Sequence, residues 1–327
     1  MALPGNILLS SNLRQLEARL RGREAYAILD GNVQEPRLAG LFRPDRILRI
    51  EAGEAAKRMA TVETLATRLL EAGADRDALL VGIGGGTTTD LTGLLAALYQ
   101  RGVACALVPT TLLAQVDAAV GGKNGVNLAG YKNMLGTFRE PEFVYICPPL
   151  AEGADEMSGI AELLKTFLLC DPAAYARAVV HFSAPAPRCA AERLTLIRRA
   201  VEIKSNIVEE DFLDRGNRHL LNLGHTFGHA LEKCSGGAVP HGDAVAIGII
   251  LAAETAVRLG EAEPALVTQL KRDFSACGLP VESPLPREAL IEAVAKDKKS
   301  REGAVRFVLP VAIGRVMVQP LKPEKLR

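Results

Sequence analysis

The chain of 327 residues lacks long apolar runs, an excess of one charge and closely spaced cysteine pairs. No stretch approaches about 18 uninterrupted apolar residues, and the N-terminus lacks the basic region and apolar run of a secretion signal. We therefore expect a soluble, cytoplasmic protein without a membrane partner. The 39 Lys and Arg residues against 38 Asp and Glu residues give a net charge of +1, so we expect no nucleic-acid partner. Any anionic ligand must then be held locally.

The six cysteines are scattered along the chain without a C-x-x-C pair, at Cys105, Cys147, Cys170, Cys189, Cys234 and Cys277. This distribution fits reduced, mostly buried thiols better than a disulfide framework. It is typical of a protein from a reducing cytoplasm.

The apolar pattern predicts two domains of different class. Hydrophobic residues make up 48% of the chain, enough for a large core. In the first half, expected strands at 25–29, 47–50, 78–83 and 104–108 alternate with helical patterns at about 55–72 and up to 99. After Pro148, expected helices cover 160–169, 190–208, 220–233, 244–259 and 263–277, followed by a hairpin of 305–309 and 315–318 around Gly314. The sequence therefore predicts an α/β domain over 1–153 and a helical domain over 154–327.

Four of the five histidines lie between His219 and His241. His225 and His229 are four residues apart, so they share one helix face, where two imidazoles can share a metal or divide metal binding and proton transfer. His241 follows, just before Gly242. The alternative is a helix with ordinary capped or half-buried histidines.

Glu162 and Lys165 are three residues apart in an otherwise apolar helix, so they should share a face. Taken alone, they read as a surface ion pair. Placed beside the histidines, Glu162 would complete a Glu-His-His set that leaves room on a divalent ion for substrate oxygens. Lys204, Arg218 and Asn222 add polar groups near the histidines, with a solvated helix face as their alternative reading.

A glycine run, Gly84-Gly85-Gly86, joins an expected buried strand to a helix and is able to bring backbone N–H groups close to a pyrophosphate. Thr87 stands where the G-x-G-x-x-G pattern has its third glycine, so a structural tight turn is an equal alternative. Thr110 and Thr111 are candidates for additional hydroxyl donors, and the equal alternative is that Pro109-Thr110 forms a plain strand-to-helix cap.

The segment from 117 to 133 is polar and rich in glycine, and we expect it to lie outside the core. Lys123 and Lys132 in this segment either bind anionic groups or are solvated loop lysines.

Taken in order, the motifs resemble the 3-dehydroquinate synthase family of sugar-phosphate cyclases over roughly residues 30–314. The matching motifs are Gly-Gly-Gly-x-x-x-Asp at 84–90, Val-Pro-Thr-Thr-Leu-Leu-Ala-Gln-Val-Asp at 108–117, Gly-Gly-Lys at 121–123, Lys-Asn-Met at 132–134, Ala-Glu-x-x-Lys at 161–165, Leu-Asn-Leu-Gly-His-Thr-Phe-Gly-His at 221–229, His-Gly at 241–242 and Asp-Lys-Lys at 297–299. The resemblance implies an N-terminal Rossmann-like NAD-binding α/β domain and a C-terminal helical metal- and substrate-binding domain, with the active site between them.

The resemblance also implies the site residues. The metal ligands, for zinc or cobalt, would be Glu162, His225 and His241, which leaves His229 as a nearby hydrogen-bonding or proton-relay residue. The residues that match NAD-binding positions are Asp30, Asn32, Glu54, Lys57, Gly85, Gly86, Thr87, Asp90, Thr110, Thr111, Lys123 and Lys132. The residues that match substrate positions are Asp117, Lys123, Asn133, Lys165, Lys204, Arg218, Asn222 and Lys298, together with Arg101, which would reach a substrate phosphate across a homodimer interface.

The implied activity converts 3-deoxy-arabino-heptulosonate 7-phosphate, a sugar-acid phosphate, into 3-dehydroquinate and phosphate in the shikimate route to aromatic amino acids. It proceeds by transient oxidation, β-elimination of phosphate, reduction, ring opening and an intramolecular aldol step, so NAD is recycled. The chain departs from the common family pattern at Thr89, Asn124, Tyr131 and Asp243. Three alternatives are a cyclase acting on sedoheptulose 7-phosphate, a metal-dependent polyol or glycerol-phosphate dehydrogenase, and a catalytically silent NAD- or metal-binding protein.

Overall fold

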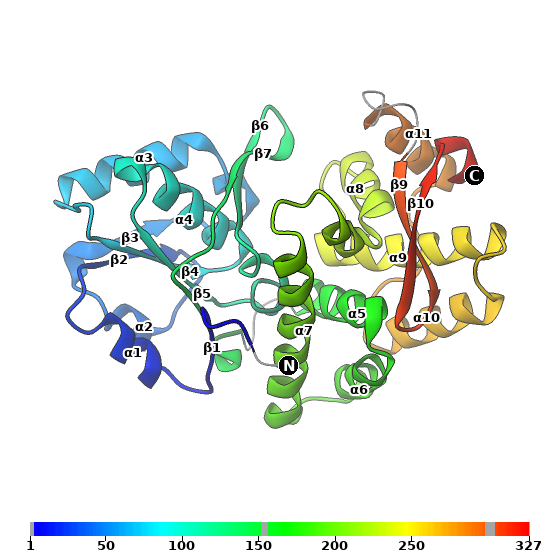
Figure 1. Ribbon diagram of the computed structural model, residues 1–327, viewed down its shortest axis with the longest axis horizontal. Helices are drawn as coiled ribbons and strands as arrows, with labels where there is room; N and C mark the ends of the chain where they lie inside the picture. The colour runs from blue at the N-terminus through cyan, green and yellow to red at the C-terminus, as the bar shows by residue number, and fades with distance from the viewer. Residues whose placement is uncertain (1–2, 152–155, 298–304, 327) are drawn as a thin grey trace. The chain divides into compact units, whose positions relative to one another are not determined.

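The computed structural model describes residues 3–151, 156–297 and 305–326. Its contacts divide the chain into two compact units, the first ending at Glu156 and the second starting at Met157. The first unit is α/β, and the second is helical with one two-stranded ribbon (Figure 1).

A six-stranded parallel sheet forms the centre of the first unit, in the order β1-β8-β5-β4-β2-β3. The strands are β1 (Ile7–Leu9), β2 (Ala25–Asp30), β3 (Ile47–Ile50), β4 (Leu79–Gly84), β5 (Ala104–Pro109) and β8 (Phe143–Ile146). The helices that connect them are α1 (Arg14–Leu20), α2 (Pro36–Ala39), α3 (Met59–Glu71) and α4 (Gly86–Leu98). The four strands predicted from apolar runs are confirmed, with ends that differ by one residue at most.

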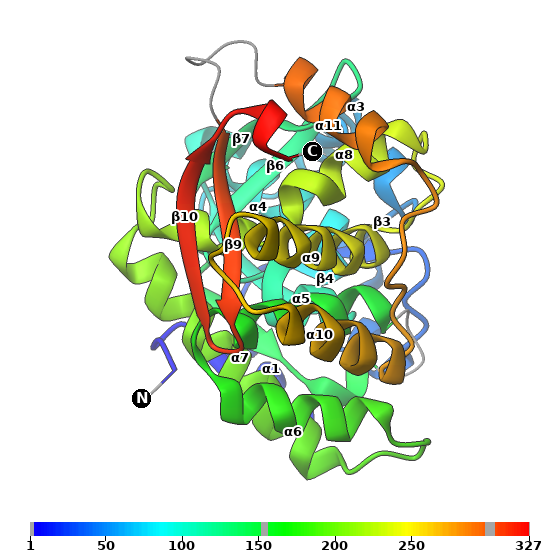
Figure 2. The ribbon, with the colours of Figure 1, turned by 90° about the vertical axis from the view of Figure 1, so that its right-hand side faces the viewer.

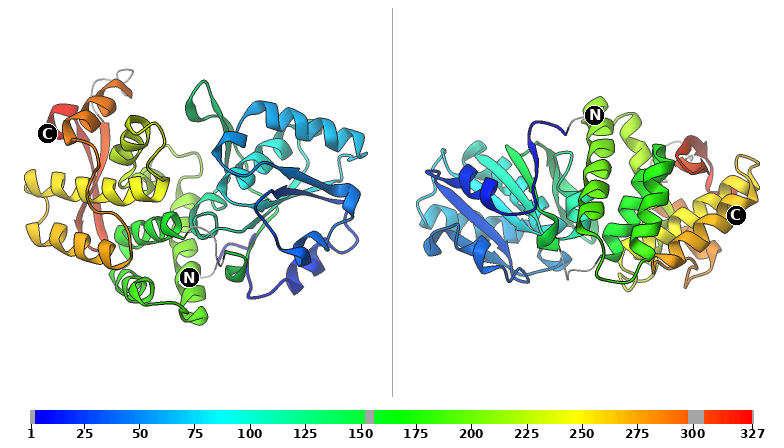
Figure 3. Two further views of the ribbon diagram at one scale, coloured as in Figure 1. Left: turned by 180° about the vertical axis from the view of Figure 1, so that it is seen from behind. Right: turned by 90° about the horizontal axis from the view of Figure 1, so that it is seen from below.

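Helices cover both faces of this sheet, which explains why its central strands are continuous apolar runs. Every residue of β2 and β4 is buried. Leu16 of α1 and Leu38 of α2 pack against Ala27 and Val81 on one face, and α3 and α4 lie over the other (Figures 1 and 3).

The strand order reverses between β2 and β4. The chain leaves β2 toward β3 on one side and leaves β4 toward β5 on the other, so the carboxyl ends of these strands open a crevice at a topological switch point. The predicted glycine run follows β4 at this point, and Asp30 ends β2 beside it. This placement is the usual ligand-binding edge of an open parallel sheet.

The segment predicted to lie outside the core is partly buried, so that prediction is wrong for its middle. It forms β6 (Lys123–Leu128), which pairs antiparallel with β7 (Tyr131–Phe138). Asn124 is 7% exposed because Gly93 of α4 leaves space for it: a Cβ at Gly93 would lie 1.8 Å from Asn124 Oδ1. Asn124 Nδ2 donates to the carbonyl oxygens of Gly122 and Arg139, at 3.1 and 2.9 Å.

The second unit contains the helices α5 (Met157–Cys170), α6 (Pro172–Ser183), α7 (Ala190–Glu210), α8 (His225–Cys234), α9 (His241–Arg258), α10 (Pro264–Ala276) and α11 (Arg287–Asp297). The strands β9 (Val305–Ala312) and β10 (Arg315–Leu321) form the predicted hairpin, with Gly314 at a φ of 81° in its turn. The sequence prediction missed α6 and α11. It also started α8 too early, because 217–222 forms a separate 3-10 turn before Gly224.

Helices α5 and α9 form the buried centre of the second unit. Residues 158–169 of α5 are all buried, and α9 is buried from Ala244 to Ala253. Helix α8 and the β9–β10 ribbon both pack against α9 (Figure 2). Glu162 therefore occupies a deeply buried position.

All six cysteines are free thiols, as predicted. Only Cys105, Cys147 and Cys277 are buried, so the expectation of mostly buried thiols is wrong for the other three. Within the described ranges, every helix is too short or too polar to cross a membrane.

Candidate active site

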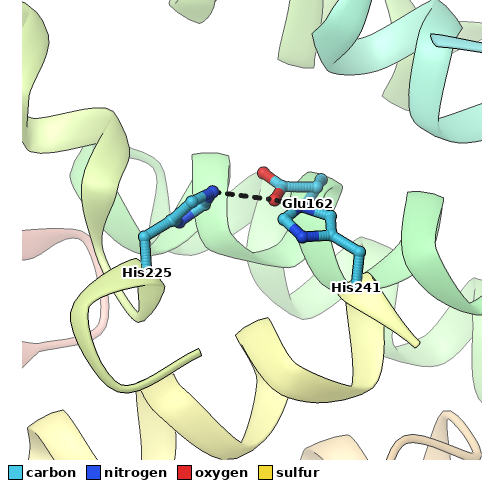
Figure 4. Close-up of side chains that lie close together, drawn as sticks. All are labelled: Glu162, His225 and His241. Atoms are coloured by element: carbon cyan, nitrogen blue, oxygen red, sulfur yellow. Dashed lines mark ion pairs between the residues drawn. The ribbon is translucent and has the colours of Figure 1, made fainter. Parts of the chain in front are cut away.

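Three helices bring Glu162, His225 and His241 together in the second unit (Figure 4). Glu162 comes from the middle of α5, and the two histidines are the first residues of α8 and α9. Nε2 of His225 lies 3.5 Å from Glu162 Oε1, and Nε2 of His241 lies 3.3 Å from the same oxygen. One potential ligand atom from each residue falls within 4.8 Å of the other two.

Close approaches at glycines hold the helices at this separation. A Cβ on Gly242 would lie 2.1 Å from the Cα of Ser158, which is one helical turn before Glu162. The backbone N–H of Gly242 donates to Ser158 Oγ at 3.2 Å. Gly224, just before His225, has a φ of 79°, and a Cβ there would lie 2.8 Å from the carbonyl oxygen of Val245. His225 thus follows Gly224, and His241 precedes Gly242. Each of these glycines lets the helix pack closely against a neighbouring helix.

Each histidine in the group has a partner for its other ring nitrogen. Nδ1 of His225 lies 3.2 Å from the carbonyl oxygen of Leu223, and Nδ1 of His241 lies 3.2 Å from Glu232 Oε1. A carbonyl or carboxylate oxygen can only accept, so each Nδ1 donates a proton. In the neutral ring this leaves a lone pair on Nε2, the nitrogen that faces Glu162. The sequence reasoning missed Glu232, although it lies one helical turn beyond His229.

The Glu162 carboxylate is fully buried. Its charge is balanced by Lys165 Nζ, which contacts Oε2, and by the imidazoles. Burial alone would raise the pKa of Glu162, but Lys165, His225 and His241 together hold that pKa well below its ordinary value. A buried, ionised carboxylate beside two imidazole nitrogens is a donor set that fits a divalent cation such as zinc or cobalt.

The two imidazoles differ in their electrostatics. Burial and the nearby Lys165 charge lower the pKa of His225, so that ring is neutral. Burial lowers the pKa of His241 as well, but the carboxylates of Glu162 and Glu232 outweigh it and raise the pKa to about 9. Coordination at Nε2 requires the neutral ring, so cation binding there releases a proton.

His229 lies near the group without joining it. Its ring centroid is 5.2 Å from that of His225 and 6.4 Å from that of His241. Within the described residues, the atoms that meet Glu162 Oε1 are the Nε2 atoms of His225 and His241. The residues that the structure brings together are therefore the set that the resemblance implied, and the pairing of His225 with His229 suggested by their spacing is not part of that group.

Burial decides between the functional and the solvent-exposed interpretations of the charged candidates. Lys165 is 1% exposed, Lys204 6% and Arg218 2%. A surface ion pair of Glu162 with Lys165 is therefore wrong, and so is a solvated helix face for Lys204 and Arg218. Asn222 is half-buried at the end of the 3-10 turn.

Asp211 holds the loop that carries Arg218. Its carboxylate accepts hydrogen bonds from the backbone N–H groups of Arg215, Gly216 and Arg218, at 2.9, 2.6 and 3.1 Å. These backbone hydrogen bonds lower the pKa of Asp211. The Arg218 guanidinium then donates through Nη1 to the carbonyl oxygen of Phe212 at 2.7 Å. The sequence reasoning missed Asp211, whose signal is an Asp at a helix end shortly before a glycine.

The first unit places many of the NAD-matched residues around the switch point. Asp30 accepts from the backbone N–H of Asn32 at 2.9 Å and from Thr88 Oγ1 at 3.0 Å. A Cβ at Gly84 would lie 2.4 Å from Thr88 Oγ1 and 2.7 Å from Asp30 Cβ, so a glycine is required there. Helix α4 begins at Gly86, and its N-cap residue, Gly85, has no side chain to accept a hydrogen bond from the first N–H groups of the helix.

Polar contacts link the other NAD-matched residues. Glu54 accepts from Thr87 Oγ1 at 3.3 Å and from Asn127 Nδ2 at 2.8 Å, and Lys57 Nζ pairs with Asp90 Oδ2 at 2.5 Å. The backbone N–H of Thr110 donates to the Gly84 carbonyl oxygen at 2.9 Å. Gly85 packs against Thr111, whose Oγ1 accepts from the N–H of Ala114, so the cap lies one residue after the predicted Pro109-Thr110.

The remaining candidates of the first unit lie on irregular backbone or on the hairpin. Arg101 is exposed and has a φ of 69°, next to Gln100 with a φ of 48°. Asp117 lies in a short π-helical turn over Ala114–Ala118. Lys123, Lys132 and Asn133 are exposed on the hairpin, and the Asn133 N–H donates to Asn127 Oδ1 at 2.9 Å. Lys298 lies outside the described residues.

Two family models match consecutive parts of the chain. The model of the 3-dehydroquinate synthase N-terminal region matches residues 47–158, and that of the C-terminal region matches residues 159–300. The 3-dehydroquinate synthase of Pyrococcus furiosus is 40% identical over 281 residues, covering 85% of this chain and 81% of that protein. That of Acidithiobacillus ferrooxidans is 40% identical over 286 residues, covering 86% and 79%.

Solved structures of two synthases share the fold of this chain. The 2-epi-5-epi-valiolone synthase of Streptomyces hygroscopicus, with NAD⁺ and Zn²⁺ bound, gives a TM-score of 0.87 at 26% identity, covering 100% of this chain and 95% of that one. A 2-deoxy-scyllo-inosose synthase complexed with carbaglucose-6-phosphate, NAD⁺ and Co²⁺ gives 0.83 at 24% identity, covering 98% and 94%.

Proposed function

The chain belongs to the 3-dehydroquinate synthase family, and from that membership we propose that it converts 3-deoxy-arabino-heptulosonate 7-phosphate into 3-dehydroquinate and phosphate. This is a carbon–oxygen lyase reaction of the shikimate route. The observation that carries the proposal is the buried Glu162 carboxylate, which faces the Nε2 atoms of His225 and His241.

The cofactors are NAD and a divalent zinc or cobalt ion. When bound, NAD supplies reversible hydride transfer and the cation supplies Lewis-acid polarisation of the reacting oxygens. Glu162, His225 and His241 would hold the cation. The residues around the β2–β4 switch point, from Asp30 and the Gly84–Gly86 turn to Glu54 and Asp90, would hold NAD.

Buried cations are the protein's main means of binding this substrate. The substrate carries a carboxylate and a phosphate, and Lys165, Lys204 and Arg218 are all nearly fully buried. A cation in a low-dielectric site attracts an anion more strongly than a solvated one does. Lys165 also contacts Glu162, so its charge acts on the cation site and on the substrate alike.

His229 is suited to proton exchange with the substrate because it lies near the Glu162 group and outside its ligand set. Lys123, Asn133, Asp117 and Lys298 would complete the substrate contacts. Arg101 would reach the substrate phosphate of a partner subunit in a cytoplasmic homodimer.

Two neighbouring activities make different demands. A cyclase acting on sedoheptulose 7-phosphate does not bind a carboxylate, and the retained Lys204, Arg218 and Asn222 favour the sugar acid. A polyol or glycerol-phosphate dehydrogenase would accumulate NADH, whereas the cyclase recycles it.

The test is to incubate the purified, metal-loaded protein with the sugar-acid phosphate and a trace of NAD⁺. We expect phosphate and dehydroquinate in equal amounts and in large molar excess over NAD⁺. Turnover of sedoheptulose 7-phosphate alone, or net formation of NADH, would assign one of the neighbouring activities. NAD binding without turnover of either sugar would indicate a silent protein.

A further inference from the structure

His219 belongs to the histidine-rich segment but lies outside the Glu162 group. It sits in the 3-10 turn Asn217–Asn222 that precedes α8. Its Nε2 lies 2.7 Å from the carbonyl oxygen of Arg306 in β9, and its Nδ1 lies 3.1 Å from Nδ2 of Asn222. The two nitrogens of this ring therefore have two different polar partners.

The chemistry of those partners fixes the hydrogen-bond directions. A carbonyl oxygen only accepts, so His219 Nε2 must donate to Arg306. In the neutral ring Nδ1 then carries a lone pair and accepts from the Asn222 amide nitrogen. If the amide turned over, Asn222 Oδ1 would meet that lone pair, so the ring disfavours the flipped orientation. His219 thus selects one of the two amide orientations of Asn222.

The anchor on the other side of the ring belongs to a paired strand. Arg306 pairs with Pro320 in the β9–β10 ribbon, and the next residue, Phe307, packs edge-to-face on Phe227 of α8 with centroids 5.4 Å apart. The ribbon therefore contacts both the 3-10 turn, through His219, and α8, through Phe227.

The position of Asn222 makes its orientation matter. It lies three residues before His225, and the intervening Leu223 carbonyl oxygen orients the His225 ring. Asn222 Oδ1 accepts no hydrogen bond from the described residues, so it is available to a ligand. A fixed amide offers one acceptor and one remaining N–H donor at defined positions, which suits a hydroxyl group that both donates and accepts.

We propose that His219 is a positioning residue for Asn222: it ties the Asn222 amide to β9 in a single orientation, ready to bind a hydroxyl group of the polyhydroxylated substrate. The proposal rests on the proposed function for its catalytic consequence. The hydrogen bonds themselves do not depend on that function.

Two substitutions separate this role from a purely structural one. His219→Asn places an amide atom near the position of Nδ1, so it keeps an acceptor for Asn222 and loses the contact with Arg306. His219→Gln reaches the position of Nε2, so it keeps the contact with the ribbon and loses the acceptor for Asn222. Both variants are compared in the wild-type and Asn222→Ala backgrounds.

We expect His219→Gln to lower kcat/KM by about 10-fold, the effect of one lost hydrogen bond, and His219→Asn to lower it by no more than about threefold. In the Asn222→Ala background, His219→Gln should have no further effect. A larger loss of kcat/KM in His219→Asn than in His219→Gln would overturn the proposal. So would a double variant, His219→Gln with Asn222→Ala, whose loss of kcat/KM equals the product of the two single losses.

A second measurement does not depend on turnover. The side-chain ¹⁵NH₂ signal of Asn222, assigned by its loss in Asn222→Ala, should shift in His219→Gln and stay close to its wild-type position in His219→Asn. An unchanged signal in His219→Gln would overturn the positioning role even if the wild-type protein turned over neither sugar. Absence of turnover in the wild-type protein, with the expected shifts present, would count against the proposed function alone.

Discussion

Glu232 Oε1 lies 3.2 Å from Nδ1 of His241, while Nε2 of the same ring faces Glu162 at 3.3 Å. Glu232 therefore orients the His241 ring, and Glu162 lies beside the ring nitrogen that would bind a cation. Glu232 is itself 8% exposed, so water competes little for this contact. The arrangement is the carboxylate–histidine pair that commonly supports a metal ligand.

Replacing Glu232 by Gln should weaken metal binding while leaving the ligand set complete. The neutral amide polarises the His241 ring less, and we expect the dissociation constant for zinc to rise about 10-fold or more. Competition with a fluorescent chelator measures this directly. The matched control is Glu282→Gln, which removes an exposed carboxylate that pairs with Lys271. Equal zinc affinity in both variants would exclude an orienting role for Glu232.

His225→Asn and His229→Asn should separate coordination from proton exchange. We expect His225→Asn to lose both tight metal binding and turnover, because it removes one of three ligands. His229→Asn should keep a full equivalent of zinc and lose turnover by about 100-fold, in the range of a missing general acid or base. Elemental analysis of the metal content, together with the rate of phosphate release, distinguishes a loss of coordination from a loss of proton exchange. A loss of zinc from His229→Asn would restore the pairing suggested by the i, i+4 spacing.

Gly242→Ala should disturb the site through packing alone. The added Cβ would lie 2.1 Å from the Cα of Ser158, a backbone atom that cannot move aside without shifting α5 or α9. We expect a loss of about 3 kcal/mol in the free energy of unfolding, at the upper end for overpacking, together with weaker zinc binding. Gly5→Ala is the control, since nothing lies within 4 Å of its added Cβ. Chemical denaturation measures the free energy of unfolding, and zinc titration measures the affinity for zinc. Wild-type values for Gly242→Ala as well as for Gly5→Ala would contradict the importance of this close approach.

The stability contributed by Asp171 should depend on pH. Asp171 accepts from the N–H of Ala174 at 2.9 Å as the N-cap of α6 and from Arg199 Nε at 2.6 Å. Burial raises its pKa, but the backbone hydrogen bond and Arg199 outweigh burial, so the folded pKa is lowered. Because the pKa of Asp171 is lower in the folded state, its contribution to the free energy of unfolding is fully present above the unfolded-state pKa of about 3.9. That contribution is lost as the pH falls through the folded-state pKa.

Asp171→Asn keeps a capping oxygen and removes the charge opposite Arg199. We expect it to lower the free energy of unfolding by about 0.5 kcal/mol at pH 7, as a partly exposed ion pair would. The difference from wild type should shrink as the pH falls below about 4. Urea unfolding at several pH values measures both effects, and a difference that grew in acid would contradict the assigned sign.

Much of the first unit could be predicted from sequence because its strands are buried on both faces. Such strands are continuous apolar runs, and β2, β4 and β5 stand out for that reason. The β6–β7 hairpin was not predictable in the same way. Asn124 is buried only because Gly93, distant in sequence, leaves it room, and no local pattern reports that fit.

The Glu162 group shows the same division between local and tertiary information. The spacing of His225 and His229 correctly indicated one helix face, and the spacing of Glu162 and Lys165 correctly indicated a contact. Spacing could not show that Lys165 is buried, or that α9 would bring His241 to Glu162. Those facts follow from the packing of α5, α8 and α9, which depends on side chains far apart along the chain.

The glycine contacts at 224 and 242 also determine how this site could be transplanted. Grafting Glu162, His225 and His241 onto another helical bundle would copy the ligands but not the helix separation that sets their spacing. A scaffold with ordinary side chains at the two crossings would hold the helices farther apart and pull the imidazoles away from the carboxylate. A protein engineer would therefore need to carry over the small residues at the helix crossings together with the ligands.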